Sequence, residues 1–176
     1  MSDPAPDRRV ARTREAIRAA FNSLILARGY DAFTAADIAE AANVGRSTFY
    51  EHFQGKDEVL AATLVPVLEP LAEACTAPAA DPRLEATIGH FWDNRRMAKA
   101  LMSGRAHAVM AGRLATLIEA RLPAGGAIPA PLLATQIAHG QLALIAEWLT
   151  GRHGCTPAQI AATLQATSCA MIAAAR

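Results

Sequence analysis

The chain has 176 residues, a formal net charge of +1 at pH 7 and a hydrophobic content of 52%. This length allows one domain or two small ones and excludes a large multidomain enzyme. The net charge does not identify a nucleic-acid-binding protein, because strong attraction to phosphate usually gives a markedly basic balance. Alanine dominates the hydrophobic residues and strand-forming runs are few, so the composition predicts an all-α protein.

The cysteines and the hydropathy pattern bear on location. Cys75, Cys155 and Cys169 are odd in number, widely spaced and without a CxxC pair, which predicts reduced thiols in the cytoplasm and no metal or cofactor. The first twenty residues carry acids and arginines, so we expect no secretory signal. Polar residues interrupt each carboxy-terminal apolar run before the roughly 18 residues that a membrane-spanning helix needs.

About nine helices are predicted, and the first runs from about Val10 to Arg28. Its apolar residues recur at spacings of three, four and seven, as expected for a helix that packs one side on a core. These residues are Val10, Ile17, Phe21, Leu24 and Ile25. Gly29 follows, and we expect it to take the left-handed conformation that closes a helix.

Two short helices are predicted next, over 35–42 and 46–53. Thr34, followed by Asp37 three residues later, is a variant of the capping box and begins the first helix. The sequence 43–45 supplies a tight turn, and Gly45 becomes the N-cap of the second helix. Phe49 and Phe53 lie four residues apart, so both point toward the core.

A further helix opens at Lys56, and Pro66 and Pro70 predict a kink or a break near Leu64. Asp81 and Pro82 are the predicted N-cap and N1 residues of the next helix, which covers about 83–94. The remaining predicted helices cover 95–103, 105–122, 131–150 and 157–175. The last of these has a complete start signal, with a threonine cap at 156, proline at N1 and glutamine at N3.

The last two predicted helices, 131–150 and 157–175, are poor in charge. From Leu122 to Ala175 the only charged side chains are Glu147 and Arg152. Helices of this kind cannot each present a solvated face, and the chain is too small to surround both. We therefore expect a homodimer in which both copies contribute these helices to a four-helix interface.

Two short helices joined by a tight turn form a helix-turn-helix, whose second helix enters the major groove of DNA. Arg46 at the start of the second helix can donate two hydrogen bonds to guanine, and Thr48 offers a methyl and a hydroxyl group. Other donor side chains, on this helix and beside it, are placed to bind phosphate. The phosphate candidates are Thr34, Tyr50, His52 and Lys56.

The segment 33–56 closely resembles the DNA-binding signature of TetR-family regulators, T-x-x-D-I-A-x-x-A-x-V-x-x-x-T-F-Y-x-H-F-x-x-K. The resemblance implies a three-helix DNA-binding domain over 1–56 and a helical ligand-binding and dimerisation domain over 57–176. It also implies a repressor that a small-molecule effector releases from palindromic double-stranded operator DNA. The positions that match DNA contacts are Thr34, Gly45, Arg46, Ser47, Thr48, Tyr50, His52 and Lys56.

This chain departs from the family pattern at two places. Gly45 stands where many members have serine, which removes a hydroxyl that caps the helix and can touch phosphate. Ala35 and Ala36 bring no donor to the start of the first short helix. Base reading is therefore expected to depend more heavily on Arg46.

The region from Leu60 to Gln141 matches no motif, as expected for the part that differs between relatives. An apolar cavity with a few polar groups is the common form of a small-molecule site, although such residues more often fill a core. The candidate pocket residues are Phe91, Trp92, Met97, Met102, His107, Met110 and His139. The histidine spacing lacks the local pairs that preset a metal site.

Two other interpretations stay open. The protein could be a constitutive or nonspecific DNA-binding regulator whose pocket is packed shut and which has no ligand. A small enzyme using Cys75, His90 and His107 is less favoured, because no spacing sets a nucleophile beside a base and no glycine-rich phosphate loop is present.

Overall fold

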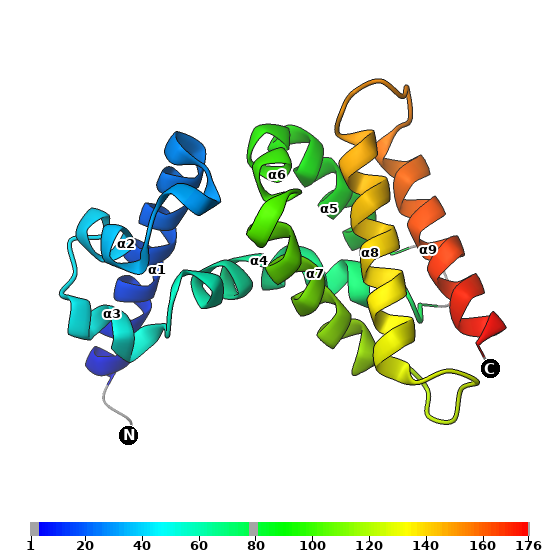
Figure 1. The fold of residues 1–176 in the computed structure, drawn as a ribbon, viewed down its shortest axis with the longest axis horizontal. Coiled ribbons are helices and arrows are strands. Elements are labelled where there is room, and N and C mark those ends of the chain that lie inside the picture. The colour runs from blue at the N-terminus through cyan, green and yellow to red at the C-terminus, as the bar shows by residue number, and fades with distance from the viewer. Residues whose placement is uncertain (1–3, 78–80, 176) are drawn as a thin grey trace. The chain divides into compact units, whose positions relative to one another are not determined.

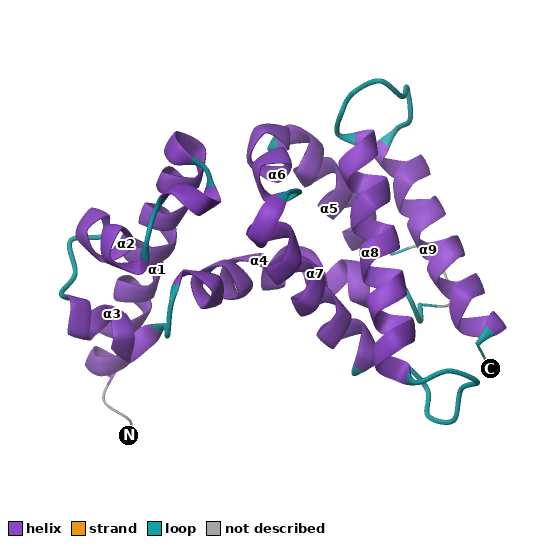
Figure 2. Cartoon of the chain, in the orientation of Figure 1, coloured by secondary structure: helices purple, strands orange, loops and turns teal. Residues whose placement is uncertain are grey.

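The computed structural model describes residues 4–77 and 81–175, and this part of the chain folds into nine α-helices and one short 3-10 helix, with no strand (Figures 1 and 2). The prediction of an all-α protein is confirmed. The helices are α1 (Pro4–Arg28), η1 (Tyr30–Ala32), α2 (Ala35–Ala41), α3 (Arg46–His52), α4 (Lys56–Glu73), α5 (Pro82–Asp93), α6 (Arg95–Leu101), α7 (Gly104–Glu119), α8 (Ala130–Trp148) and α9 (Pro157–Ala174).

Internal contacts divide the chain into two compact units, residues 1–63 and 64–176. The division falls within α4, whose first turns belong to the amino-terminal unit. Among the described residues, no helix combines the length and apolar character that crossing a membrane requires.

In the amino-terminal unit, α1 packs one side on α2 and η1. Ile17, Phe21 and Ile25 are buried as predicted, but Val10 is 42% exposed, so its place in the apolar stripe was wrong. The reason is length. At 1.5 Å per residue, α1 is roughly 37 Å long and the seven-residue helices α2 and α3 are roughly 10 Å each, so they cannot cover all of it.

Gly29 ends α1, and its N–H donates to the carbonyl oxygen of Ile25 at 2.9 Å. Its φ of 77° is positive, as predicted, but its ψ of 159° is extended rather than left-handed helical. This combination is essentially restricted to glycine. The residue therefore redirects the chain into η1 instead of closing α1 with a left-handed turn.

The sequence predicts a kink or a break near Leu64. Helix α4 runs without interruption, so a break is wrong, and a kink stays a prediction. Each proline removes one helical hydrogen bond, and burial of an apolar stripe elsewhere on the helix offsets this cost. That stripe includes Leu64, Leu68 and Leu71, which are at most 5% exposed.

The carboxy-terminal unit consists of the rest of α4 and helices α5 to α9. Helix α8 packs on α7 and α9, and α5 packs on α9; Figure 1 shows α8 and α9 side by side. The predicted start signals are confirmed. Asp81 accepts a hydrogen bond from the N–H of Arg83 at 2.8 Å, and Thr156 with Gln159 forms a complete capping box.

Candidate nucleic-acid interface

The short helices α2 and α3 are joined by a tight turn. Asn43 has a positive φ of 53°, and its N–H donates to the carbonyl oxygen of Glu40 at 3.0 Å. The N–H of Val44 donates to the carbonyl oxygen of Ala39 at 3.0 Å. These bonds end α2 and place Gly45 as the N-cap of α3. The arrangement matches the predicted helix-turn-helix.

Helix α3 is anchored by its aromatic side. Phe49 is 1% exposed and Phe53 is 2% exposed, as predicted from their spacing. The guanidinium of Arg14 on α1 lies 5.0 Å from the centre of the Phe53 ring, a cation–π contact that the sequence pattern did not reveal. Because α3 is fixed on this side, its opposite side has a defined orientation.

The opposite side of α3 presents polar side chains to solvent. Arg46 and Ser47 are exposed and Tyr50 is 58% exposed, while Thr48 and His52 are half-buried. A helix with arginine and hydroxyl groups on its open face can donate hydrogen bonds both to base edges and to phosphate oxygens. The structure therefore brings five of the eight sequence-predicted contact residues onto one short helix.

Thr34, at the start of α2, is already engaged with Asp37. The Thr34 hydroxyl donates to Oδ2 of Asp37 at 2.6 Å, and the Thr34 N–H donates to the same oxygen at 2.7 Å. These bonds, with the nearby guanidinium of Arg28, lower the pKa of Asp37. The capping box is confirmed, and a phosphate at this position would compete with Asp37 for the hydroxyl proton.

Lys56 contacts the segment that leads into α2. Its ammonium donates to the carbonyl oxygens of Tyr30 and Phe33 at 2.8 and 2.9 Å. Asp57, the next residue, accepts a hydrogen bond from the Tyr30 hydroxyl. Sequence reasoning missed Tyr30 and Asp57, because their partners are more than twenty residues distant in the chain.

The seven candidate pocket residues are divided between the core and the surface of the carboxy-terminal unit. Phe91 and Met110 are buried, and His139 is exposed. The rings of His107 and His139 have centroids 5.6 Å apart, and those of Trp92 and Trp148 are 4.9 Å apart. Their role as a ligand pocket stays a prediction.

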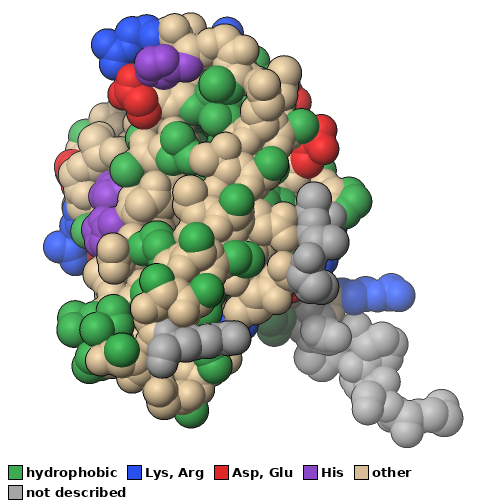
Figure 3. All heavy atoms as spheres, turned by 90° about the vertical axis from the view of Figure 1, so that its right-hand side faces the viewer, with side chains coloured by type: hydrophobic (Ala, Val, Ile, Leu, Met, Phe, Trp, Pro, Cys, Tyr) green, Lys and Arg blue, Asp and Glu red, His purple; other side chains and the backbone are tan. Residues whose placement is uncertain are grey.

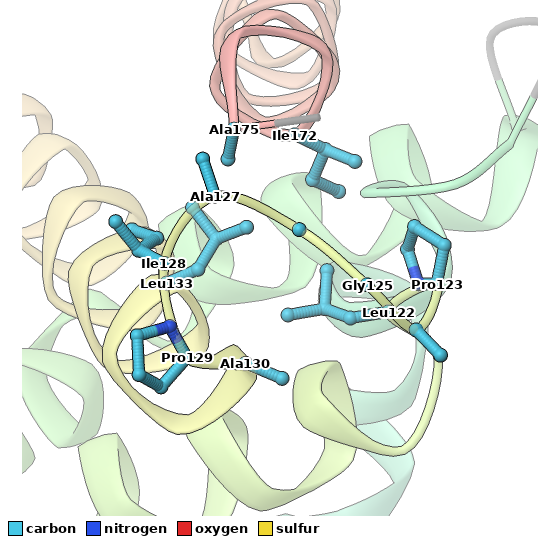
Figure 4. Close-up of a pocket in the computed structure, with 12 residues that line it drawn as sticks. Leu122, Pro123, Gly125, Ala127, Ile128, Pro129, Ala130, Leu133, Ile172 and Ala175 are labelled. Atoms are coloured by element: carbon cyan, nitrogen blue, oxygen red, sulfur yellow. The ribbon is translucent and has the colours of Figure 1, made fainter.

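A separate pocket of about 310 Å³ lies where the loop between α7 and α8 meets the end of α9 (Figure 4). Leu122, Ile128, Leu133 and Ile172 give it an apolar lining, and none of the seven predicted residues lines it. The N–H of Ala127 donates to the carbonyl oxygen of Ala175 at 2.6 Å, which holds the loop against α9.

The residues of the alternative enzyme interpretation do not form an activated nucleophile. Cys75 is buried, and burial raises the pKa of its thiol to about 11. A thiol in this environment stays protonated near neutral pH and is a poor nucleophile.

A sequence profile described as "Bacterial regulatory proteins, tetR family" matches residues 17–63. These residues span the carboxy-terminal half of α1, the helix-turn-helix and the first turns of α4. Residues 17–63 therefore carry the DNA-binding signature of the TetR family. The match lies within the amino-terminal unit and includes residues 33–56, whose resemblance predicted the DNA-binding signature.

Two curated proteins each resemble a part of this chain. The first, described as the uncharacterized HTH-type transcriptional regulator YxbF of Bacillus subtilis, is 44% identical over 55 residues, which are 31% of this chain. The second, the HTH-type transcriptional regulator TcmR of Streptomyces glaucescens, is 36% identical over 85 residues, or 48% of this chain. The aligned segments span only 14% and 38% of the lengths of these relatives.

Solved structures show a similar fold over nearly the whole chain. A TetR transcriptional regulator from Streptococcus agalactiae matches with a TM-score of 0.61 and 23% identity, covering 93% of this chain and 97% of that one. A TetR-family regulator from Streptomyces coelicolor matches with a TM-score of 0.65 and 21% identity, covering 93% and 96%. At this level of identity the likeness shows a shared fold.

Proposed function

We propose that this TetR-family protein is a DNA-binding transcriptional regulator that reads a duplex through α3. The observation that carries the proposal is the two-sided character of this helix, with Phe49 and Phe53 buried and Arg46, Ser47 and Tyr50 open to solvent. The description of both curated relatives as HTH-type transcriptional regulators supports it.

The proposed contacts divide into base reading and phosphate binding. Arg46, in the first turn of α3, donates two hydrogen bonds to guanine O6 and N7, and Ser47 and Thr48 contact neighbouring base edges. Tyr50 and His52 donate to phosphate oxygens, and these bonds fix the register of the helix on the duplex. Thr34 and the backbone at Gly45 lie beside the same phosphates.

A homodimer supplies the second recognition helix that a palindromic operator requires. Its proposed interface is the outer side of α8 and α9. The exposed positions of α9 are alanine, threonine and glutamine, and the only charged residue of α8 is Glu147. Figure 3 faces this side of the molecule and shows charged side chains toward its edges, with hydrophobic and uncharged groups between them.

In this proposal, a small apolar effector binds within the carboxy-terminal unit and releases the repressor from its operator DNA. The candidate residues are Phe91, Trp92, Met97, Met102, His107, Met110 and His139. An effector changes DNA affinity only if it binds one conformation of the dimer more tightly than the other. A regulator without a ligand, or a nonspecific DNA-binding protein, is the alternative.

Selection of bound duplexes from a random pool tests the proposal. We expect enrichment of a palindrome by the wild type, and loss of its guanine preference, with retention of the fold, in Arg46→Ala. Arg96→Ala, which removes an exposed arginine of α6, is the matched control and should select the wild-type palindrome. Equal binding to all duplexes, with affinity set by salt alone, would favour the nonspecific alternative.

A further inference from the structure

The contacts of Lys56 distinguish it from the other predicted DNA contacts. An ammonium group has three N–H donors, and two of them are bound to the carbonyl oxygens of Tyr30 and Phe33, at 2.8 and 2.9 Å. The same nitrogen lies 4.5 Å from the centre of the Tyr30 ring and 5.2 Å from that of the Phe33 ring. The charge of the Lys56 ammonium and two of its three N–H donors are thus satisfied within the protein.

The two carbonyl groups belong to the segment that leads into α2. Tyr30 and Phe33 are 3% and 2% exposed, and both rings pack edge-to-face on Phe21 of α1. Thr34, the N-cap of α2, follows directly after Phe33. A bond to the Phe33 carbonyl therefore fixes the backbone immediately before the helix-turn-helix.

The neighbouring residue strengthens this link. Asp57, also in the first turn of α4, accepts a hydrogen bond from the Tyr30 hydroxyl. Lys56 and Asp57 together hold Tyr30 by its backbone and by the end of its side chain. Moving the ammonium outward to a phosphate would leave the carbonyl oxygens of Tyr30 and Phe33 without this donor, and a buried acceptor without a partner is costly.

We infer that Lys56 is a positioning residue, which fixes the start of α2 and thereby the orientation of α3, and that it does not bind DNA phosphate. The inference rests on the proposed DNA-binding function for its binding measurement. The ammonium is a compact group that fits between two carbonyl oxygens, whereas a guanidinium is planar and donates in a fixed fork. Arginine should therefore replace Lys56 poorly.

The dependence of DNA affinity on salt separates the two roles, because each phosphate contact contributes about 0.9 to the slope of log K against log salt. Lys56→Met and Lys56→Arg are compared with the wild type on the selected duplex. The matched control is Lys99→Met, which removes the other lysine, an exposed residue of α6. If Lys56 is a positioning residue, both Lys56 variants should lose about tenfold in DNA affinity, because charge-assisted hydrogen bonds are lost. The slope of log K against log salt should not change.

Hydrogen exchange without DNA gives an independent measurement. The amide of Ile38 donates to the Thr34 carbonyl oxygen at 3.2 Å, so its protection reports on the first turn of α2. We expect faster exchange of this amide in Lys56→Met and in Lys56→Arg, and wild-type exchange in Lys99→Met.

Three results together would overturn the inference and assign Lys56 to phosphate binding. They are a salt slope reduced by about 0.9 in Lys56→Met, wild-type DNA affinity in Lys56→Arg, and wild-type exchange of the Ile38 amide in both variants. If the wild type itself binds no duplex, the proposed function fails. The exchange measurement still decides whether Lys56 holds the start of α2.

Discussion

The side-chain amide of Gln141 on α8 donates from Nε2 to Oγ of Ser168 on α9 across 2.9 Å. The two residues are 3% and 1% exposed. The same nitrogen donates to the carbonyl oxygen of Leu71 near the end of α4 at 3.2 Å, so one side chain joins three helices of the carboxy-terminal unit. In the described part of the chain, Oε1 of Gln141 has no hydrogen-bond partner.

A double-mutant cycle on Gln141 and Ser168 measures this link. Either single substitution removes the hydrogen bond between the two side chains, so the double mutant loses this bond only once. We expect Gln141→Leu with Ser168→Ala to lose less stability than the sum of the single losses, by about 1 kcal/mol in denaturant unfolding. The control is Thr163→Ala, on the exposed side of α9. Its loss of stability and that of Gln141→Leu should add in the double mutant. Additivity in both cycles would contradict the link.

Gly45 offers a stabilising substitution at the N-cap of α3. Its φ of −63° and ψ of 149° suit any residue, and an added Cβ would meet only ordinary contacts, 3.8 Å from Thr48 Oγ1 and 3.9 Å from Ser47 Oγ. Gly45→Ser should raise the free energy of unfolding by about 0.5 to 1 kcal/mol, through a capping hydroxyl and a less flexible unfolded chain.

Gly29→Ser is the opposing control for that substitution. Gly29 has a φ of +77°, a conformation that side chains strain, so serine there should lower the free energy of unfolding. Denaturant unfolding of both variants checks the pair. A loss of stability in Gly45→Ser would show that the N-cap geometry differs from that described above.

Local signals were predictable from the sequence and long-range ones were not. The capping boxes at Thr34 and Thr156 depend on residues three positions apart, so their pattern is complete in the sequence. The exposure of Val10 depends on how far other helices reach along α1. The two carbonyl partners of Lys56 lie 26 and 23 residues before it, and no periodicity connects them.

The proposed dimer interface predicts a position-specific effect of charge. Ala166 is exposed on α9 and lies opposite the buried side formed by Ile160, Leu164 and Ser168. Glutamate at this position would be buried without a partner in the interface, so Ala166→Glu should raise the dimer dissociation constant by about tenfold or more. Sedimentation equilibrium measures the constant.

Ala86→Glu places the same charge on an exposed position of α5 and is the control for that experiment. It should associate like the wild type. Equal association of the two variants would argue against the outer side of α8 and α9 as the interface.

The stability of the carboxy-terminal unit should depend on pH through His107, which is half-buried on α7. Its ring centroid lies 5.6 Å from that of His139. Burial, and secondarily the charge of His139, lower the pKa of His107 from 6.5. The unfolded chain consequently binds more protons than the folded chain as the pH falls through this value, and the free energy of unfolding decreases. Denaturant unfolding between pH 5 and 7.5 should show this decrease in the wild type and a smaller one in His107→Gln. Since burial is the larger cause, His139→Gln should retain most of the contribution of His107. The same pH dependence in His107→Gln as in the wild type would assign the effect to other groups.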